Sequence, residues 1–281
     1  MANMMIKKQL RSISLPSRSH PSTSGIEEAL NKFKTTNSNK SSSASILTGL
    51  AALEELYDCT DEFLNTSSTQ RVMSTVGSDF MEEMLDGSLR LMDICSVSRD
   101  LMVETQEHVR DLQSCVRRKK VAGGGDQVNV AVSGYATFRK NMRKASKKIL
   151  GSSKTIVGVS SSYDNGQCDE HLVAVIDAMR RVDVVSDVVL KSFLEFLSGR
   201  QSNIKRKLAS VLKKKKDHHE ETKNELESLD SAIRGDLCFC DYLQEKLEEV
   251  EMIIGGFEKN LEGLLRRLIR TRTSLLNIIS H

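Results

Sequence analysis

Residues 226–278 decide the fold class, and they read LESLDSAIRGDLCFCDYLQEKLEEVEMIIGGFEKNLEGLLRRLIRTRTSLLNI. Apolar side chains return at alternating steps of three and four residues, which is the heptad spacing of helices that pack on other helices. Asp236 and Thr271 are the two polar positions in about seven heptads. The seam positions are Leu226, Leu229, Ile233, Asp236, Cys240, Leu243, Leu247, Val250, Ile254, Phe257, Leu261, Leu264, Leu268, Thr271, Leu275 and Ile278. The stretch predicts a long C-terminal helix with one apolar face.

Two arrangements can bury this seam. Two chains can pair through residues 226–278 as a coiled coil, or helices of the same chain can cover the seam in a bundle. We favour the bundle because upstream segments have apolar stripes of their own that need burial. A homo-oligomer through 226–278 stays open as the alternative. Gly255 and Gly256 lie inside the seam, so we expect a kink or a close helix approach there.

The rest of the chain is typical of an all-α protein. Its only two prolines are Pro16 and Pro21, so no proline interrupts the remaining residues. Apolar residues recur with helical spacing in several upstream segments, which predict helices over 46–64, 78–119, 135–150 and about 172–196. The glycines at 123–125 stop the second of these, and we expect flexible loops near 121–134 and 151–168. We predict a multi-helix bundle closed by the heptad helix.

The first 24 residues differ in composition from the helical domain of residues 25–281. They are rich in serine and basic, and we expect a disordered arm because they offer little apolar surface to bury. Arg11-Ser-Ile-Ser14-Leu-Pro16 has the form that 14-3-3 proteins bind once Ser14 is phosphorylated, because the added charge pairs with arginines. The arm lacks acidic residues, so an organelle transit peptide stays open as a second interpretation.

Charge is patterned along the chain although its sum is only +3. Residues 117–154 hold eleven Lys and Arg against one acid, and 217–251 hold twelve Asp and Glu against three bases. Such blocks pair with one another inside a protein or attract an anionic membrane. The candidate basic surface is Arg139, Lys140, Arg143, Lys144, Lys147 and Lys148. Nucleic acid is disfavoured as a partner because the basic runs offer few aromatic side chains for base stacking.

No motif in the sequence indicates an enzyme. There is no phosphate-binding glycine loop, no dinucleotide fingerprint, no zinc-protease motif and no serine-hydrolase elbow. The six cysteines are spread widely, which is typical of reduced thiols in the cytoplasm. We expect no catalytic residue, no cofactor and no metal site. We expect a cytoplasmic protein, with a membrane surface and the nucleus as alternatives.

Several segments together resemble the plant-specific BYPASS-like family, also described as BPS1-like. The segments are 11–21 (RSISLPSRSHP), 53–57 (LEELY), 85–95 (LDGSLRLMDIC), 99–101 (RDL), 112–114 (LQS) and 264–279 (LLRRLIRTRTSLLNII). The resemblance implies a helical plant protein connected with root and shoot development, and it supplies no catalytic residue or cofactor. We therefore expect a non-enzymatic developmental or signalling protein that acts as a helical interaction module. The alternative is a peripheral membrane protein that binds anionic lipids through its basic helices.

Overall fold

The computed structural model describes residues 23–35, 42–122, 125–152, 170–199, 224–235 and 240–280. Helices make up nearly all of these ranges, and no strand occurs in them, which confirms the all-α prediction. The helices are α1 (Ser24–Thr35), α2 (Ser43–Leu64), α3 (Ser67–Met73), α4 (Ser78–Ala122), α5 (Gly125–Ser152), α6 (Glu170–Ser198), α8 (Glu225–Arg234) and α9 (Cys240–Ser280). Most of the predicted arm, including Ser14, lies outside the described residues, as do 153–168 of the predicted second loop.

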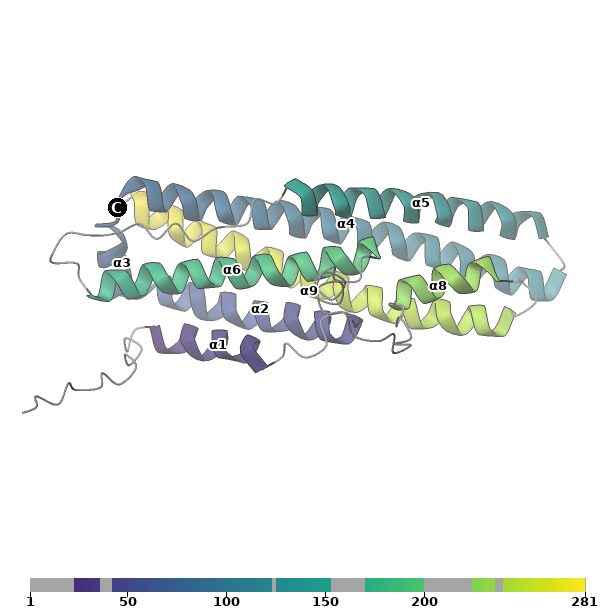
Figure 1. The fold of residues 1–281 in the computed structure, drawn as a ribbon, viewed down its shortest axis with the longest axis horizontal. Coiled ribbons are helices and arrows are strands. Elements are labelled where there is room, and N and C mark those ends of the chain that lie inside the picture. The colour runs from purple at the N-terminus through teal and green to yellow at the C-terminus, as the bar shows by residue number, and fades with distance from the viewer. Residues whose placement is uncertain are drawn as a thin grey trace, which may run out of the picture.

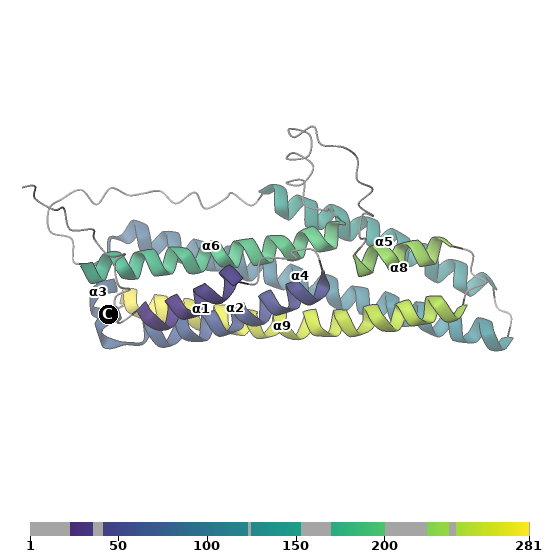
Figure 2. The ribbon, with the colours of Figure 1, turned by 60° about the horizontal axis from the view of Figure 1, so that its bottom comes forward.

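The helices form one elongated bundle (Figure 1). α4 and α9 lie side by side over most of its length, and α4, with 45 residues, is about 70 Å long at 1.5 Å per residue. α2 packs on α9 and α6, and α1 packs on α2. α5 packs on α4 and α6 toward the other end of the bundle, where α8 lies beside α9 (Figure 2). Each long helix thus has partners in the same chain for its apolar face.

The C-terminal seam forms the centre of the core. Every seam position from Leu243 to Ile278 is buried, including the polar Thr271. The Phe257 ring contacts the rings of Phe193 and Phe196 in α6, with centroids 5.0 and 5.4 Å apart. Helices of the same chain therefore cover the seam, as the bundle interpretation predicts.

The seam is divided between two helices, which the continuous heptad pattern does not predict. α8 ends at Arg234, and the backbone of Gly235 is extended, with φ −68° and ψ 169°. α8 packs back against α9, so Leu226, Leu229 and Ile233 are buried beside the helix that they were expected to extend. Glycine favours an end to a helix because it costs about 1 kcal/mol relative to alanine in a helix interior.

The expected flexible loop over 121–134 is also wrong in extent. α4 continues to Ala122 and α5 begins at Gly125, so only 123–124 fall outside the described residues. Val128 is buried, and Ala131 and Val132 pack against the core. These residues extend the apolar stripe of α5 by two turns, and their burial favours helix over a loop.

The close approach expected at the glycine pair occurs at Gly256. A Cβ atom at Gly256 would lie 3.1 Å from Leu47 Cδ2 of α2, whereas one at Gly255 would meet nothing within 4 Å. α9 continues through both residues as a helix. Gly256 therefore lets α2 pack closely on α9.

Candidate functional site

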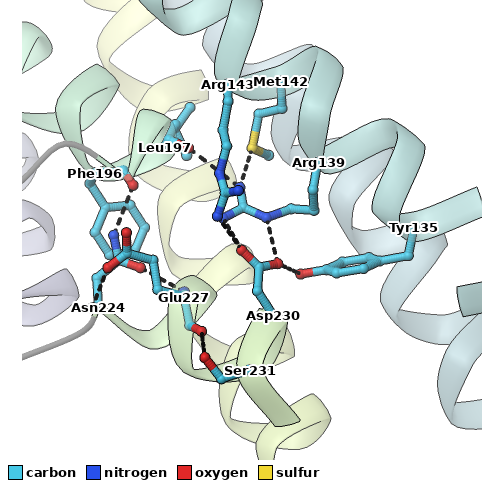
Figure 3. A network of polar contacts seen from close by, with 10 residues as sticks. All are labelled: Tyr135, Arg139, Met142, Arg143, Phe196, Leu197, Asn224, Glu227, Asp230 and Ser231. Atoms are coloured by element: carbon cyan, nitrogen blue, oxygen red, sulfur yellow. Dashed lines mark hydrogen bonds and ion pairs between the residues drawn. The ribbon is translucent and has the colours of Figure 1, made fainter. Parts of the chain in front are cut away.

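A buried ionic cluster joins α5 to α8. Asp230 of α8 accepts hydrogen bonds from Arg139 Nε and Nη2, both at 3.0 Å, and from Arg143 Nη2 at 2.5 Å (Figure 3). The Tyr135 hydroxyl donates to the same carboxylate at 3.1 Å. Residues 135, 139 and 143 are four apart, which places all three side chains on one face of α5. A single aspartate thus faces two arginines and a tyrosine.

Tyr135, Arg139 and Asp230 lie almost entirely out of solvent, whereas the Arg143 side chain is 30% exposed. The Arg139 side chain is 3% exposed and the Asp230 side chain is 8% exposed. Burial and the nearby Asp230 raise the pKa of Tyr135 above its ordinary value. Burial alone would lower the pKa of Arg139, but the hydrogen bond to Asp230 raises it overall. Tyr135 therefore stays a neutral hydrogen-bond donor and Arg139 stays charged.

The end of α6 is attached to the same cluster. Arg139 Nη1 also donates to the Leu197 carbonyl at 3.4 Å, and Asn224 Nδ2 donates to the Phe196 carbonyl at 2.9 Å. Asn224 caps α8 as well, in a reciprocal capping box with Glu227. These contacts fix α5, α6 and α8 at the point where the chain leaves α6 and enters α8 (Figure 3).

A surface depression of about 520 Å³ opens over this cluster. Its lining comes from α5 and α8 and holds six cations and one carboxylate, Asp230. The lining residues are Val132, Tyr135, Ala136, Arg139, Lys140, Arg143, Lys144, Lys147, Asp230, Ile233 and Arg234. Six cations less one carboxylate give the described residues of the lining a formal charge of +5.

The structure divides the predicted basic surface into two groups. Arg139 was expected on the surface and is buried, because Asp230 supplies the counter-charge that makes burial possible. Arg143 is partly buried on the same carboxylate. Lys140, Lys144, Lys147 and Lys148 are exposed, and all but Lys148 line the depression.

Sequence reasoning missed Tyr135, Asp230 and Arg234 as members of this site. Asp230 belongs to the acidic block that was expected to balance the basic helices, but nothing local marks it as the residue that does so. It directly follows the buried seam residue Leu229, and that position on an amphipathic helix is the only available signal. Tyr135 could have been found from its spacing of four to Arg139.

A second titratable cluster lies between α2, α4 and α6. Asp183 is buried there beside Gly87 of α4, and burial raises its pKa from 3.8 to about 7 although Arg90 acts to lower it. The Tyr57 hydroxyl shares a 2.9 Å hydrogen bond with Ser186 in the same region. These groups are buried among packed helices, so they do not form an accessible site.

Two further features bear on the expected chemistry. Across the described ranges, no group of three His, Cys, Asp or Glu side chains is arranged to hold a metal ion. No helix in these ranges combines the length and the apolar composition that crossing a membrane requires.

Comparison with known protein families identifies the family of this chain. The family model described as Protein BPS1 matches residues 49–278, from within α2 to near the end of α9. The chain belongs to the Protein BPS1 family. The BYPASS-like resemblance is thereby confirmed, and membership indicates a plant developmental protein. No curated protein and no solved structure gave a significant match. The matched range of the BPS1 family includes both α5 and α8, and so the whole ionic cluster.

Proposed function

We propose that this BPS1-family protein is non-enzymatic and acts as a helical interaction module in root and shoot development. An exposed apolar stripe on α9 carries the proposal. Ile269, Leu276 and Ile279 are 44 to 51% exposed and follow heptad-like spacing on the side of α9 that the buried seam leaves free. Large apolar side chains gathered on one exposed face are typical of protein-binding surfaces.

Contacts between α9 and α4 place the stripe at a defined position on the bundle. Arg272 lies within the stripe, and its guanidinium donates to the Leu85 carbonyl and, at 2.9 Å, to Ser88 Oγ of α4. Leu89, next to Ser88 on α4, is 46% exposed. The stripe and Leu89 together offer an apolar surface against which a partner helix can pack.

Proximity labelling in plant cells tests the proposal. The variant replaces Ile269, Leu276 and Ile279 with Gln in the full chain. The matched control makes three Val→Gln changes at Val173, Val184 and Val188, which are 43 to 47% exposed on α6. We expect a reproducible set of partners to be lost with the α9 variant and kept with the control. Identical partner sets for both variants would contradict the proposal.

Anionic membrane is the second candidate partner, favoured by the exposed lysines along α5. Lys140, Lys144, Lys147 and Lys148 lie within about 100° of one another around the helix, and all four are exposed. Neutralising them should abolish salt-sensitive binding to phosphatidylserine vesicles. Binding that is indifferent to the change would remove this candidate.

The N-terminal arm offers one further partner. We propose that 14-3-3 proteins bind phosphorylated Ser14, which the sequence motif supports. A phosphopeptide of residues 8–20 should bind a 14-3-3 protein, and the unphosphorylated peptide should not. We propose that the protein is cytoplasmic, and fluorescence imaging of the tagged full chain tests this.

A further inference from the structure

The depression between α5 and α8 has a fixed cationic floor. Arg139 and Arg143 both bind Asp230, so two guanidinium groups are held in place by one carboxylate, and one positive charge is left over. The Leu197 carbonyl and the Met142 sulfur also contact Arg139 Nη1. A preorganised cationic surface binds an anion with little loss of side-chain freedom.

Lysines form one wall of the depression and an arginine contributes from the other side. Lys140, Lys144 and Lys147 follow one another along α5, and their Cα positions span about 10 Å at 1.5 Å per residue. Arg234, the last residue of α8, joins them from the second helix. A row of this length is longer than one phosphate group and matches several phosphates on a small scaffold.

The shape of the site favours a compact ligand. Its volume of about 520 Å³ lies in the range of small-molecule sites, and the lining joins two helices around a hollow instead of a flat face. Lysine ammonium groups and arginine forks are the side chains that bind phosphate oxygens best. Among the described residues that line the depression, Tyr135 is the only aromatic one, and it is 2% exposed, so these residues offer no free aromatic face to a nucleobase.

We propose that this depression binds a small anion that carries several phosphate groups, as an inositol polyphosphate or a phosphoinositide headgroup does. Lys140, Lys144, Lys147 and Arg234 contact the phosphates, while Arg139 and Arg143 form the floor. This site is separate from the apolar stripe on α9, so its failure would leave the interaction proposal untouched.

Isothermal titration calorimetry of the full chain with inositol hexakisphosphate tests the site. The variant combines Lys140→Gln, Lys144→Gln and Lys147→Gln, which changes exposed side chains and leaves Arg139, Arg143 and Asp230 intact. We expect saturable binding to the unchanged protein and a Kd about tenfold to a hundredfold weaker in the variant, since each partly exposed ion pair contributes up to about fivefold.

A matched control distinguishes specific binding in the depression from nonspecific attraction to a positively charged protein. It combines Arg71→Gln, Arg117→Gln and Lys259→Gln, which remove the same charge from exposed positions outside the lining. We expect this control to keep its Kd within about twofold. Equal weakening in both variants, or no saturable binding to the unchanged protein, would overturn the proposal. Circular dichroism melting confirms that both variants are folded.

Vesicles distinguish the two sources of the phosphates. Vesicles of phosphatidylcholine with phosphatidylinositol bisphosphate are compared with vesicles of phosphatidylcholine and phosphatidylserine at equal surface charge. Preference for the phosphoinositide, lost in the lysine variant and competed by free inositol hexakisphosphate, supports a headgroup in the depression. Binding of the free compound without vesicle preference supports a soluble ligand. Equal binding to both vesicle types, with no binding of free inositol hexakisphosphate, would contradict a specific phosphate site in the depression.

Discussion

Asp183 gives this bundle a pH-dependent stability that can be calculated from the structure. Its carboxyl is buried between α6 and α4, beside Gly87, and burial raises its pKa from 3.8 to about 7, with smaller contributions in the same direction from Glu83 and Asp187. Among the described residues, its Oδ2 atom has no hydrogen-bond partner. Burying the ionised form is therefore costly, and the folded protein favours the protonated form.

The direction of the pH dependence follows from the linkage between proton binding and folding. Because the folded pKa exceeds the unfolded pKa, the folded state holds a proton between about pH 4 and pH 7 that the unfolded state has released. The contribution of this residue to the free energy of unfolding is greatest below about pH 4 and falls as the pH rises to 7. The two pKa values predict a loss of roughly 2–3 kcal/mol between about pH 5 and pH 8.

Urea unfolding at these two pH values measures the effect. Asp183→Asn removes the ionisation, so its free energy of unfolding should decline less than that of the unchanged protein, by roughly 2–3 kcal/mol over the interval. Asp177→Asn, at an exposed carboxylate on the same helix, is the control and should leave the slope unchanged. An Asp183→Asn protein with the same pH slope as the unchanged protein would refute this reasoning.

Three further substitutions test other parts of the structure by thermal or urea unfolding. Gly87→Ala should destabilise the protein because its Cβ would lie 2.5 Å from Asp183 Oδ2, and this clash outweighs the preference of about 1 kcal/mol that alanine has for a helix. An added Asp183→Ala change should remove the clash and restore stability. Arg139→Met should lower the free energy of unfolding by about 3 kcal/mol, since it leaves the buried Asp230 paired with Arg143 alone. An added Asp230→Asn change should recover part of this loss. Leu261→Ala should cost about 2–5 kcal/mol because the side chain is fully buried in the seam.

Helix positions were predictable because their signals are local. Ser42 caps α2 through its Oγ atom, which accepts from the Ser45 amide at 3.2 Å, and the apolar stripe from Leu50 to Leu64 runs through the same helix. The start of α5 was missed because the Gly-rich run suggested a long connector, while Val128 is held in helix by burial. Burial against other helices outweighed the local loop signal at this position.

The division of the C-terminal seam shows where periodicity alone misleads. The spacing of Leu226, Leu229 and Ile233 continues into α9 without a slip, so the pattern suits one helix or two. The tertiary structure places α8 alongside α9, where both apolar faces are buried in the same core. A heptad pattern records which side of each helix is apolar, and it does not record where the chain reverses.

The basic surface was predicted only in part, for a related reason. The spacing of Lys140, Lys144 and Lys147 puts them on one side of α5, and all three line the depression. It could not separate these lysines from Arg139, because burial of Arg139 depends on Asp230, which lies 91 residues away in the sequence. Whether an arginine lies on the surface or in the interior was decided by the partner that the fold brought to it.

The sequence by itself determined the helical class and the apolar face of each long helix, because both depend on residues within a few turns of one another. It also determined the family, because family membership depends on sequence similarity. Only the tertiary structure decided which cations are neutralised, which carboxyl group has a pKa near 7 and where a depression opens. Helical hydrogen bonds join residues four apart, so local patterns specify them. Burial and electrostatic pairing depend on contacts between distant helices, and these form only when the whole bundle packs.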